Sequence, residues 1–247
     1  MNTFLSAVAA VLLLLLTAVE LYRAGIVRVN YPDEDRFPVW GIDVSHHQGA
    51  IDGPAVRENG LAFAFIKATE GATHRDTRFS ENWTGAGEAG LARGAYHFFT
   101  FCTDGVAQAE NFLARTAELA AELPPVADVE FAGNCKRWES VAAVRRELGR
   151  FLARVEERLG RRPLLYYTDE AAHEILDGHF HEHPRWPRSV VGEPPDETLG
   201  AWTFWQYADN ARILGIRGPV DLNVFRGGRD EFDGFVRARW EEHVSPP

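Results

Sequence analysis

The chain has 247 residues, of which 45% are hydrophobic, so it is long enough to bury one sizeable core and we expect a single folded domain. Its 36 acidic residues outnumber its 26 basic residues and give a net charge of −10. A chain this acidic, without a Lys/Arg cluster that offsets the overall sign, is a poor candidate for nucleic-acid binding. Nothing in the composition requires an oligomer, and we expect a monomer.

A nearly unbroken apolar run extends from Phe4 to Val19. Its 16 residues are short for a spanning helix, which needs roughly 17–25, although Leu21 and Tyr22 could extend it. The run lacks the basic start and the cleavage site of a typical signal peptide, and it also lacks the polar face of a core helix. We therefore interpret this segment as a signal peptide or a membrane anchor and expect an exported protein, whether periplasmic, attached to the cell envelope or inner membrane, or secreted.

The chain divides into three parts by composition. Residues 1–22 form the apolar segment, residues 23–37 read as a linker, and residues 38–240 form the folded domain. Within the domain, short apolar runs alternate with amphipathic stretches. The predicted strands cover residues 39–45, 62–69, 93–99, 124–131, 163–168, 188–191, 203–208 and 220–225, and the predicted helices cover residues 76–90, 104–121, 138–159 and 169–177.

The clearest of these helices is 138–159, whose apolar residues repeat with a period of 3.6 and which ends at Gly160. Asp104 is placed to cap the helix that follows it. Strands that alternate with helices predict parallel βα units. We therefore expect an α/β fold, an irregular (β/α) TIM-like barrel, with fewer helices in its last third.

Two carboxylates end the run 124–131, which begins with two prolines and reads as a buried strand. Because side chains alternate across a strand, Val126, Asp128 and Glu130 share one face, and the two acids lie about 7 Å apart by strand rise. Neighbouring buried carboxylates repel, so one of them keeps a proton near neutral pH. Acid-assisted cleavage of a glycosidic bond requires such a pair. The alternative is a structural pair held by nearby Arg or Lys.

Other predicted strands also end in polar or aromatic residues, and the active site of a βα barrel lies at the C-terminal ends of its strands. Six segments are involved: Asp43–Gly49, Ile66–Gly71, Gly94–Phe98, Asp128–Glu130, Trp205–Tyr207 and Val220–Asn223. In this order they resemble the motifs of family-25 glycoside hydrolases, the muramidases or lysozymes also found in phage, bacteria and fungi. The resemblance covers about residues 39–226. It implies an irregular (β/α)-barrel and hydrolysis of the β-1,4 bond between N-acetylmuramic acid and N-acetylglucosamine in peptidoglycan glycan strands.

The resemblance also implies roles for individual residues. Glu130 matches the general acid, Asp128 matches the carboxylate that stabilises the reacting N-acetyl group or the developing cation, and Asp43 and Asp221 match further acids of the cleft. The residues expected to bind the sugar are Tyr96, His97, Tyr166, Trp205 and Gln206. It implies retention of configuration with the substrate's acetamido group as nucleophile. No metal or organic cofactor is implied.

For two of these residues the sequence leaves a second interpretation open. His97 could instead be a buried, hydrogen-bonded residue, and Trp205 could belong to the core. The segment Arg185–Ser189 keeps a tryptophan but departs from the commoner Trp-x-Ala pattern of the family. The rival functions are a non-catalytic glycan-binding module and a scaffold protein of the cell envelope.

The two cysteines, Cys102 and Cys135, are not in a metal-like spacing. They follow the third and fourth predicted strands, which would be neighbours in a barrel, so their loops would emerge on the same rim beside Glu130. We therefore predict a disulfide between them, as an exported domain allows, whereas two free buried thiols are the alternative.

Overall fold

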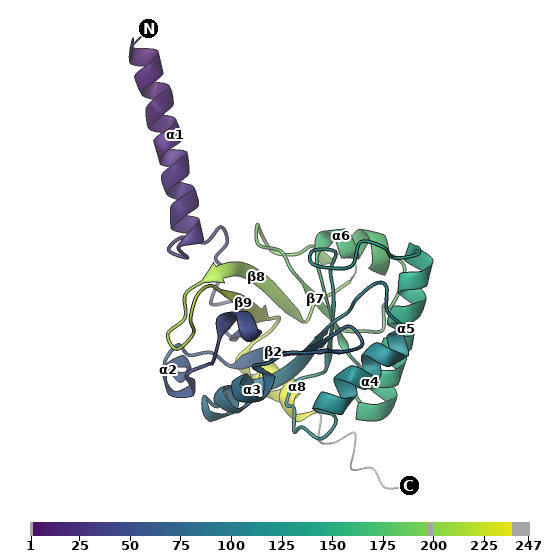
Figure 1. Cartoon of the computed structure of the whole chain (residues 1–247). Coiled ribbons are helices and arrows are strands. Elements are labelled where there is room, and N and C mark those ends of the chain that lie inside the picture. Colours follow the sequence, from purple (N-terminus) through teal and green to yellow (C-terminus); the bar gives the residue numbers. More distant parts are fainter. Residues whose placement is uncertain (1, 197–199, 239–247) are drawn as a thin grey trace.

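An eight-stranded barrel forms the centre of the computed structural model, which describes residues 2–196 and 200–238 (Figure 1). The barrel strands are β1 (Trp40–Val44), β2 (Phe63–Glu70), β4 (Ala92–Phe98), β5 (Val126–Val129), β6 (Leu164–Tyr167), β7 (Arg185–Pro187), β8 (Phe204–Ala211) and β9 (Val220–Phe225). A two-residue strand, β3 (His74–Arg75), pairs with β2 outside this path.

The helices lie outside the barrel and at its ends. They are α1 (Asn2–Arg23), η1 (His46–Gln48, a 3₁₀ helix), α2 (Gly53–Arg57), α3 (Phe79–Glu88), α4 (Gly105–Thr116), α5 (Val141–Leu159), α6 (Asp169–Ala171), η2 (Ala172–Leu176, a π-helix that continues α6) and α8 (Arg229–Arg237). Helices α4 and α5 pack side by side on one flank of the barrel (Figure 1).

The strands follow the order β7-β6-β5-β4-β2-β1-β9-β8. All neighbours are parallel except around β9, which is antiparallel to both β1 and β8. The last pair is antiparallel because the connection between β8 and β9 is too short for a crossover helix. The sheet closes through a parallel bridge between Arg188 and Gln206 and through the backbone bond from Ser189 N to Gln206 O, 2.9 Å long. The predicted irregular α/β barrel is therefore confirmed.

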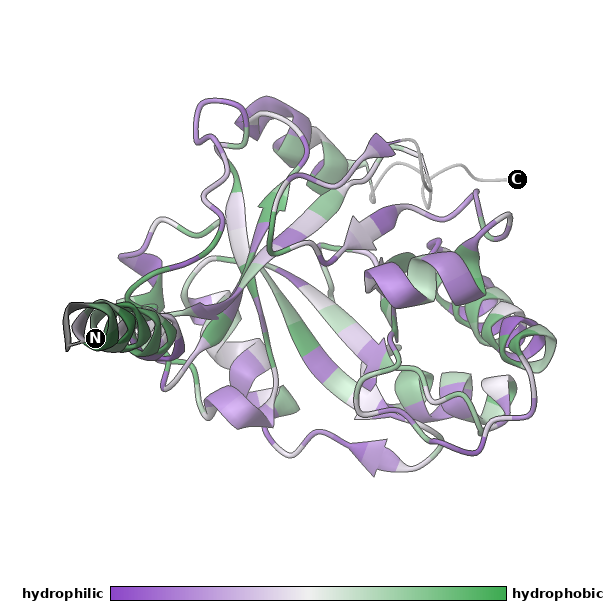
Figure 2. Ribbon diagram, turned by 90° about the horizontal axis from the view of Figure 1, so that it is seen from above, coloured by the Kyte–Doolittle hydropathy of each residue, from purple (hydrophilic) through white to green (hydrophobic). Residues whose placement is uncertain are grey.

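Two apolar layers follow from the alternation of side chains along each strand. The inner layer fills the barrel with large rings, among them Phe63, Phe65, Trp186 and Phe204, all nearly or fully buried. The outer layer lies between the strands and the surrounding helices and includes Phe112 of α4 and the apolar stripe of α5. Figure 2 shows the hydrophobic residues of the strands at the centre of the domain and polar residues on the outer faces of the helices.

Most element boundaries match the sequence patterns. The Asp104 side chain accepts a hydrogen bond from Ala107 N at the start of α4, as predicted. Helix α5 begins at Val141 rather than at residue 138 because Ser140 is its N-cap, and Gly160 ends it in a left-handed conformation with φ of 62°. The predicted helix 104–121 ends earlier, at Thr116, since the chain then turns toward β5.

Several predictions of elements were wrong or incomplete. The sixth barrel strand lies at Arg185–Pro187 and not at residues 188–191, because the chain leaves the sheet after the bridge at Arg188. The short elements α2 and β3 and the helix α8 were not predicted. The last two residues of the predicted domain, 239–240, lie outside the described residues.

Helix α1 stands away from the barrel and contains the predicted apolar run (Figure 1). It is long and apolar enough to cross a membrane. The residues that follow it up to β1, 24–39, include no helix or strand.

The predicted disulfide between Cys102 and Cys135 is present and joins the loops that follow β4 and β5. Asn134 reinforces the same junction, since its Nδ2 donates to the carbonyl oxygens of Phe99 and Glu130, each at 2.9 Å. The loop that carries Glu130 is therefore held to its neighbour by one covalent bond and by an amide.

We predict that reduction of this disulfide destabilises the domain. The bond links residues 33 positions apart, and closing a loop of that size restricts the unfolded chain by about 3–4 kcal/mol in the chain-entropy treatment. Since each kcal/mol is worth about 2–4 °C in a domain of this size, the melting temperature should fall by roughly 5–15 °C under reductant. Differential scanning calorimetry measures the shift, with the double variant Cys102→Ser/Cys135→Ser as control, whose melting temperature should not respond to reductant. An unchanged midpoint after thiol titration has shown complete reduction would contradict the prediction.

Candidate active site

Two acids lie side by side at the end of β5. Asp128 is the third residue of the strand and is 6% exposed, and Glu130 follows the strand directly. Asp128 Oδ1 is buried, and no group in the described part of the chain donates a hydrogen bond to it. A buried carboxyl oxygen without a partner is costly, so this atom is available for a donor on a bound molecule.

A second pair of acids lies across the mouth of the barrel. Asp43 of β1 and Asp221 of β9 are paired in register. Asp221 stands at the mouth because β9 runs against the other strands, so that its first residues reach the end where β1 finishes. Burial raises the pKa of both carboxyls, and it raises that of Asp221 well above its ordinary value, with the charge of Asp43 and a hydrogen bond between the two acids as the next causes. Hydrogen bonds to Asp43 partly offset the effect of burial on its pKa, so we assign the proton of the pair to Asp221.

Two amides hold the Asp43 carboxylate. Its Oδ2 accepts a hydrogen bond from Gln206 Nε2 at 2.9 Å and another from Asn223 Nδ2 at 2.8 Å. The orientation of each amide is set by a further donor. Tyr166 Oη donates to Gln206 Oε1 at 3.0 Å, and Trp186 Nε1 donates to Asn223 Oδ1 at 2.8 Å.

Each of these amides therefore presents its NH₂ group to Asp43, because its carbonyl oxygen is already occupied by a ring donor. The network joins four strands of the barrel around one carboxylate. Such a network fixes the position of Asp43 without a cation.

Two connected hollows lie at this mouth and share the acids. The wider one has a volume of about 350 Å³ and is lined by Asp43, Val44, Ser45, His47, Gln48, Lys67, Glu70, Tyr96, Phe98, Asp128, Glu130, Gly133 and Asp221. The smaller one, about 100 Å³, extends inward and is lined by Asp43, Tyr96, Asp128, Glu130, Tyr166, Trp186, Gln206 and Asp221. We call the two together the cleft.

Burial is the main cause of the unusual acidity in the cleft. Burial raises the pKa of Glu130, Arg188 and Lys67 lower it, and the negative charge of Asp43 raises it, so that together these causes bring the pKa of Glu130 to about 7. Burial also raises the pKa of Asp128 well above its ordinary value, with the neighbouring Glu130 as the next cause. The pair Asp128 and Glu130 therefore keeps a proton into the neutral range.

The cations near the acids are bound to other carboxylates. Lys67 Nζ lies 2.7 Å from Glu70 Oε2 and packs over the ring of Phe98, and Arg188 donates to Asp209 Oδ2 at 2.6 Å.

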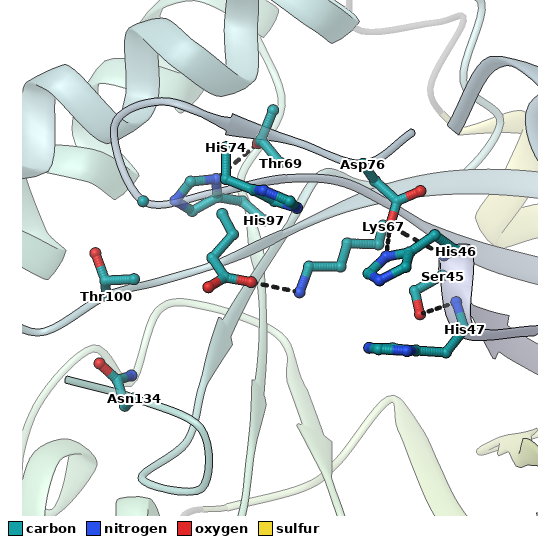
Figure 3. Close-up of polar contacts among 12 residues, drawn as sticks. Ser45, His46, His47, Lys67, Thr69, His74, Asp76, His97, Thr100 and Asn134 are labelled. Carbon is teal, nitrogen blue, oxygen red and sulfur yellow. Dashed lines mark hydrogen bonds and ion pairs between the residues drawn. The ribbon is translucent and has the colours of Figure 1, made fainter. Parts of the chain in front are cut away.

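A buried carboxylate, Asp76, holds the turn that follows β1. Its Oδ2 accepts hydrogen bonds from His46 N at 3.0 Å and from His46 Nδ1 at 2.7 Å, while Ser45 caps the same turn through its bond to His47 N (Figure 3). The turn brings His47 to the wall of the cleft, and His46 has a structural role. In the described ranges, no group of three or more His, Cys, Asp or Glu side chains is arranged to hold a metal ion.

The structure brings together seven of the nine residues that the sequence placed in the site. Asp43, Asp128, Glu130, Asp221, Tyr96, Tyr166 and Gln206 all line the cleft.

His97 and Trp205 do not line it, and as sugar contacts they require correction. His97 is fully buried in the outer layer, where its ring bonds to Thr69 (Figure 3). The other ring nitrogen bonds to Gln108, and burial lowers the pKa of His97 to about 3. Trp205 donates to Ser189 O and packs on Phe37.

Sequence reasoning missed several members of the site. Trp186 and Asn223 complete the network around Asp43, and His47, Gln48 and Phe98 line the cleft. Phe98 could have been found, since it alternates with His97 and so points to the same side of β4 as Tyr96. Alternation could not place Trp186, because β7 has only three residues, and the tryptophan that this segment keeps from the family pattern was the available signal.

Comparison with known proteins agrees with this geometry. Residues 42–216 match the model of glycosyl hydrolases family 25. The chain is 41% identical over 205 residues to "Uncharacterized protein YegX" of Escherichia coli O6:H1, covering 81% of this chain and 74% of that protein. It is 37% identical over 213 residues to "Lysozyme M1" of Streptomyces globisporus, covering 79% of this chain and 72% of that protein.

A solved structure, a family 25 glycosyl hydrolase from Bacillus anthracis, superposes with a TM-score of 0.77 at 36% sequence identity, covering 84% of this chain and 97% of that chain. The resemblance drawn from the six sequence motifs is thereby confirmed. The chain belongs to glycosyl hydrolases family 25 and is a glycoside hydrolase.

Proposed function

We propose that this protein is a muramidase that cleaves the β-1,4 bond between N-acetylmuramic acid and N-acetylglucosamine in peptidoglycan, with Glu130 as the general acid. The observation that carries the proposal is the carboxyl of Glu130 at the mouth of the cleft, where burial raises its pKa to about 7. A carboxyl with this pKa is protonated in a useful fraction at neutral pH and can protonate the leaving oxygen.

Asp128 supports the same reaction from the neighbouring position. Its unpartnered Oδ1 can accept the N–H of the substrate's acetamido group. Such a bond favours the ionised form of Asp128, so that the proton of the coupled pair stays on Glu130. The oriented acetamido oxygen then attacks the anomeric carbon as the glycosidic bond breaks, and water hydrolyses the intermediate with retention of configuration. Substrate-assisted catalysis of this kind is a known exception to the two-carboxylate scheme.

The acids around Asp43 complete the proposed site. The carboxylate of Asp43 is fixed by two amides, and the neutral Asp221 beside it is a hydrogen-bond donor. We assign to Asp43 the stabilisation of positive charge that develops at the sugar ring and to Asp221 a role in supporting Asp43. Tyr96 and Tyr166 offer aromatic walls to the sugar.

We also propose that the barrel acts outside the cytoplasm. The disulfide between Cys102 and Cys135 belongs to an oxidising compartment, and peptidoglycan lies there too. The rival function, a non-catalytic glycan-binding module, does not need four neighbouring acids, two of them buried, since binding alone gains nothing from their repulsion.

Glu130→Gln should abolish cleavage while keeping the fold. General acid catalysis contributes about 10²–10⁴-fold, so kcat should fall by at least two orders of magnitude. The measurement is digestion of purified peptidoglycan by residues 36–247 with reducing-end analysis, where wild type should release fragments ending in N-acetylmuramic acid. Glu139→Gln, the same change at an exposed position, is the matched control and should remain active. Binding of the glycan without cleavage by wild type would favour the rival module.

The activity should depend on pH through Glu130. Because the acid must be protonated, kcat/KM should fall as pH rises through about 7. The cation of Arg188 favours the ionised form of Glu130, so Arg188→Gln should raise the pKa of the acid and move this alkaline limb to higher pH. A pH profile of kcat/KM on soluble glycan fragments measures both effects. A shift to lower pH in the variant would contradict the assignment.

Two tryptophans provide a matched test of the network around Asp43. Trp186→Phe removes the donor that orients Asn223, so we expect kcat to fall about tenfold, the equivalent of roughly 1.4 kcal/mol. Trp205→Phe removes a donor to Ser189 O outside the cleft and should leave kcat near the wild-type value. Steady-state kinetics, with each variant at the same concentration of folded protein, measures the two kcat values. An equal fall of kcat in both variants would show that the network has no special part in catalysis.

A further inference from the structure

Helix α1 is apolar on all sides, and the domain covers none of its apolar window. Figure 2 shows the helix end-on, with hydrophobic residues around most of its circumference. Its 22 residues extend about 33 Å at 1.5 Å per residue, which matches a hydrocarbon core about 30 Å thick. A helix that docks in a protein groove keeps a polar face, so the surroundings that fit this surface are lipid chains.

The last turn of this helix is bonded to β8 of the barrel. Tyr22 Oη donates to Asp209 Oδ1 at 2.6 Å. Asn210 Nδ2 donates to the carbonyl oxygens of Tyr22 and Val27, at 2.7 and 3.0 Å. Removal of the helix as a signal peptide would take away two of these three partners, the hydroxyl and the carbonyl oxygen of Tyr22, which belong to the half-buried end of the helix.

The chain is also fitted closely to the barrel just after the helix. Arg212 Nε donates to Ala24 O at 3.0 Å. Gly25 has φ of 70°, and a Cβ at this position would lie 2.3 Å from Asn210 O. Only glycine allows this approach, so the junction between α1 and the barrel is a specific contact and not a free tether.

This contact lies at the mouth of the barrel. Strand β8 runs in the same direction as β1, because both are antiparallel to β9, so β8 also ends at the rim that carries the cleft. Asp209 Oδ2 accepts a hydrogen bond from Arg188, whose charge acts on Glu130. A continuous chain of contacts thus leads from Tyr22 through Asp209 and Arg188 to the cleft.

Most of the exposed apolar residues outside α1 lie in the segment that joins α1 to the barrel, whereas Leu214 is bonded to Asn59 in the turn before β2. Among the described residues, the large hydrophobic side chains that are exposed beyond α1 are Ile26, Val27, Val29, Tyr31, Val191 and Leu214. Four belong to the segment after α1, and Val191 and Leu214 belong to the loops after β7 and β8. The loop after β7 rises on the same side as α1 (Figure 1). Exposed apolar residues beside a spanning helix, such as Ile26, Val27 and Val191, are suited to the lipid interface.

We propose that α1 is a retained membrane anchor docked on the end of β8, and that it holds the mouth of the barrel against the bilayer surface. Tyr22 lies only three residues, about 4.5 Å, beyond Val19, the end of the apolar run, so the barrel begins directly at the headgroups. The cleft then takes glycan that lies next to the membrane. This last step rests on the proposed function, whereas the anchoring and the orientation do not.

The orientation is tested with the full chain in liposomes of phosphatidylcholine and phosphatidylglycerol that contain nitroxide-labelled lipid. A fluorophore is placed through Val191→Cys at the rim or through Asp233→Cys on α8, which follows β9 at the opposite end of the barrel. We expect strong quenching at position 191 and little at position 233. Equal quenching at both positions, or quenching only at position 233, would overturn the proposed orientation.

The docking is tested by the double variant Tyr22→Phe/Asn210→Ala in the same liposomes. Loss of the contacts with β8 should reduce the quenching at position 191 severalfold, since the barrel is then free to turn about its linker. Arg23→Ala is the matched control, because Arg23 pairs with Glu20 of the same exposed turn and not with β8 in the described part of the chain, and its quenching should equal that of the parent. Unchanged quenching in the double variant would overturn the docking.

Retention of the anchor is tested by the intact mass of the protein recovered from membranes of the expressing cell. A mass that includes residues 1–36 supports retention of the anchor, and a mass that lacks α1 overturns the proposal. A dimer that forms through α1 in the absence of lipid would also overturn it. Quenching needs no catalysis and should be the same in Glu130→Gln, while digestion of soluble peptidoglycan fragments needs no membrane. Failure of the orientation and failure of the muramidase assignment are therefore distinguished.

Discussion

Repulsion among four carboxyl groups in one buried cleft is the constraint on which the site depends. Glu130 and Asp128 share one side of the mouth, and Asp43 and Asp221 share the other. The usual remedy, an Arg or Lys bound directly to the acids, would lower their pKa values and remove the proton that a general acid needs. In this barrel the nearby cations are instead occupied by Glu70 and Asp209.

The irregular part of the barrel follows from the same constraint. A parallel eighth strand would bring its last residues to the mouth, whereas the antiparallel β9 brings its first ones and thereby sets Asp221 opposite Asp43. The proton that Asp221 keeps beside the charge of Asp43 replaces a cation. The amides of Gln206 and Asn223 stabilise the remaining charge with dipoles, which hold Asp43 in place but leave the pKa of Glu130 high.

Much of this arrangement could be predicted from residues that lie close together in sequence. Alternation along β5 placed Asp128 on the inner face, and the order of strands and helices indicated the barrel. The same alternation puts His97 on the opposite face from Tyr96, and Trp205 on the opposite face from Gln206. It could therefore have excluded His97 and Trp205 from the cleft, but they were assigned to the site because they belong to the same motifs. The contact of Trp186 with Asn223 could not be predicted from the sequence, because it depends on closure of the sheet between β7 and β8 and on the reversed direction of β9. No local pattern determines either feature.

The acids of the site also lower the stability of the folded domain. The loop that carries Glu130 is held in place by additional bonds. A carboxyl whose pKa is raised on folding binds more protons in the folded than in the unfolded state at intermediate pH. Stability therefore falls as pH rises from the ordinary range of a carboxyl toward the folded value, which is about 7 for Glu130. Repulsion would push the loop of Glu130 outward as this charge develops. The disulfide between Cys102 and Cys135 and the amide of Asn134 join that loop to its neighbour, so the acid can ionise during turnover without moving away from the bond that it cleaves.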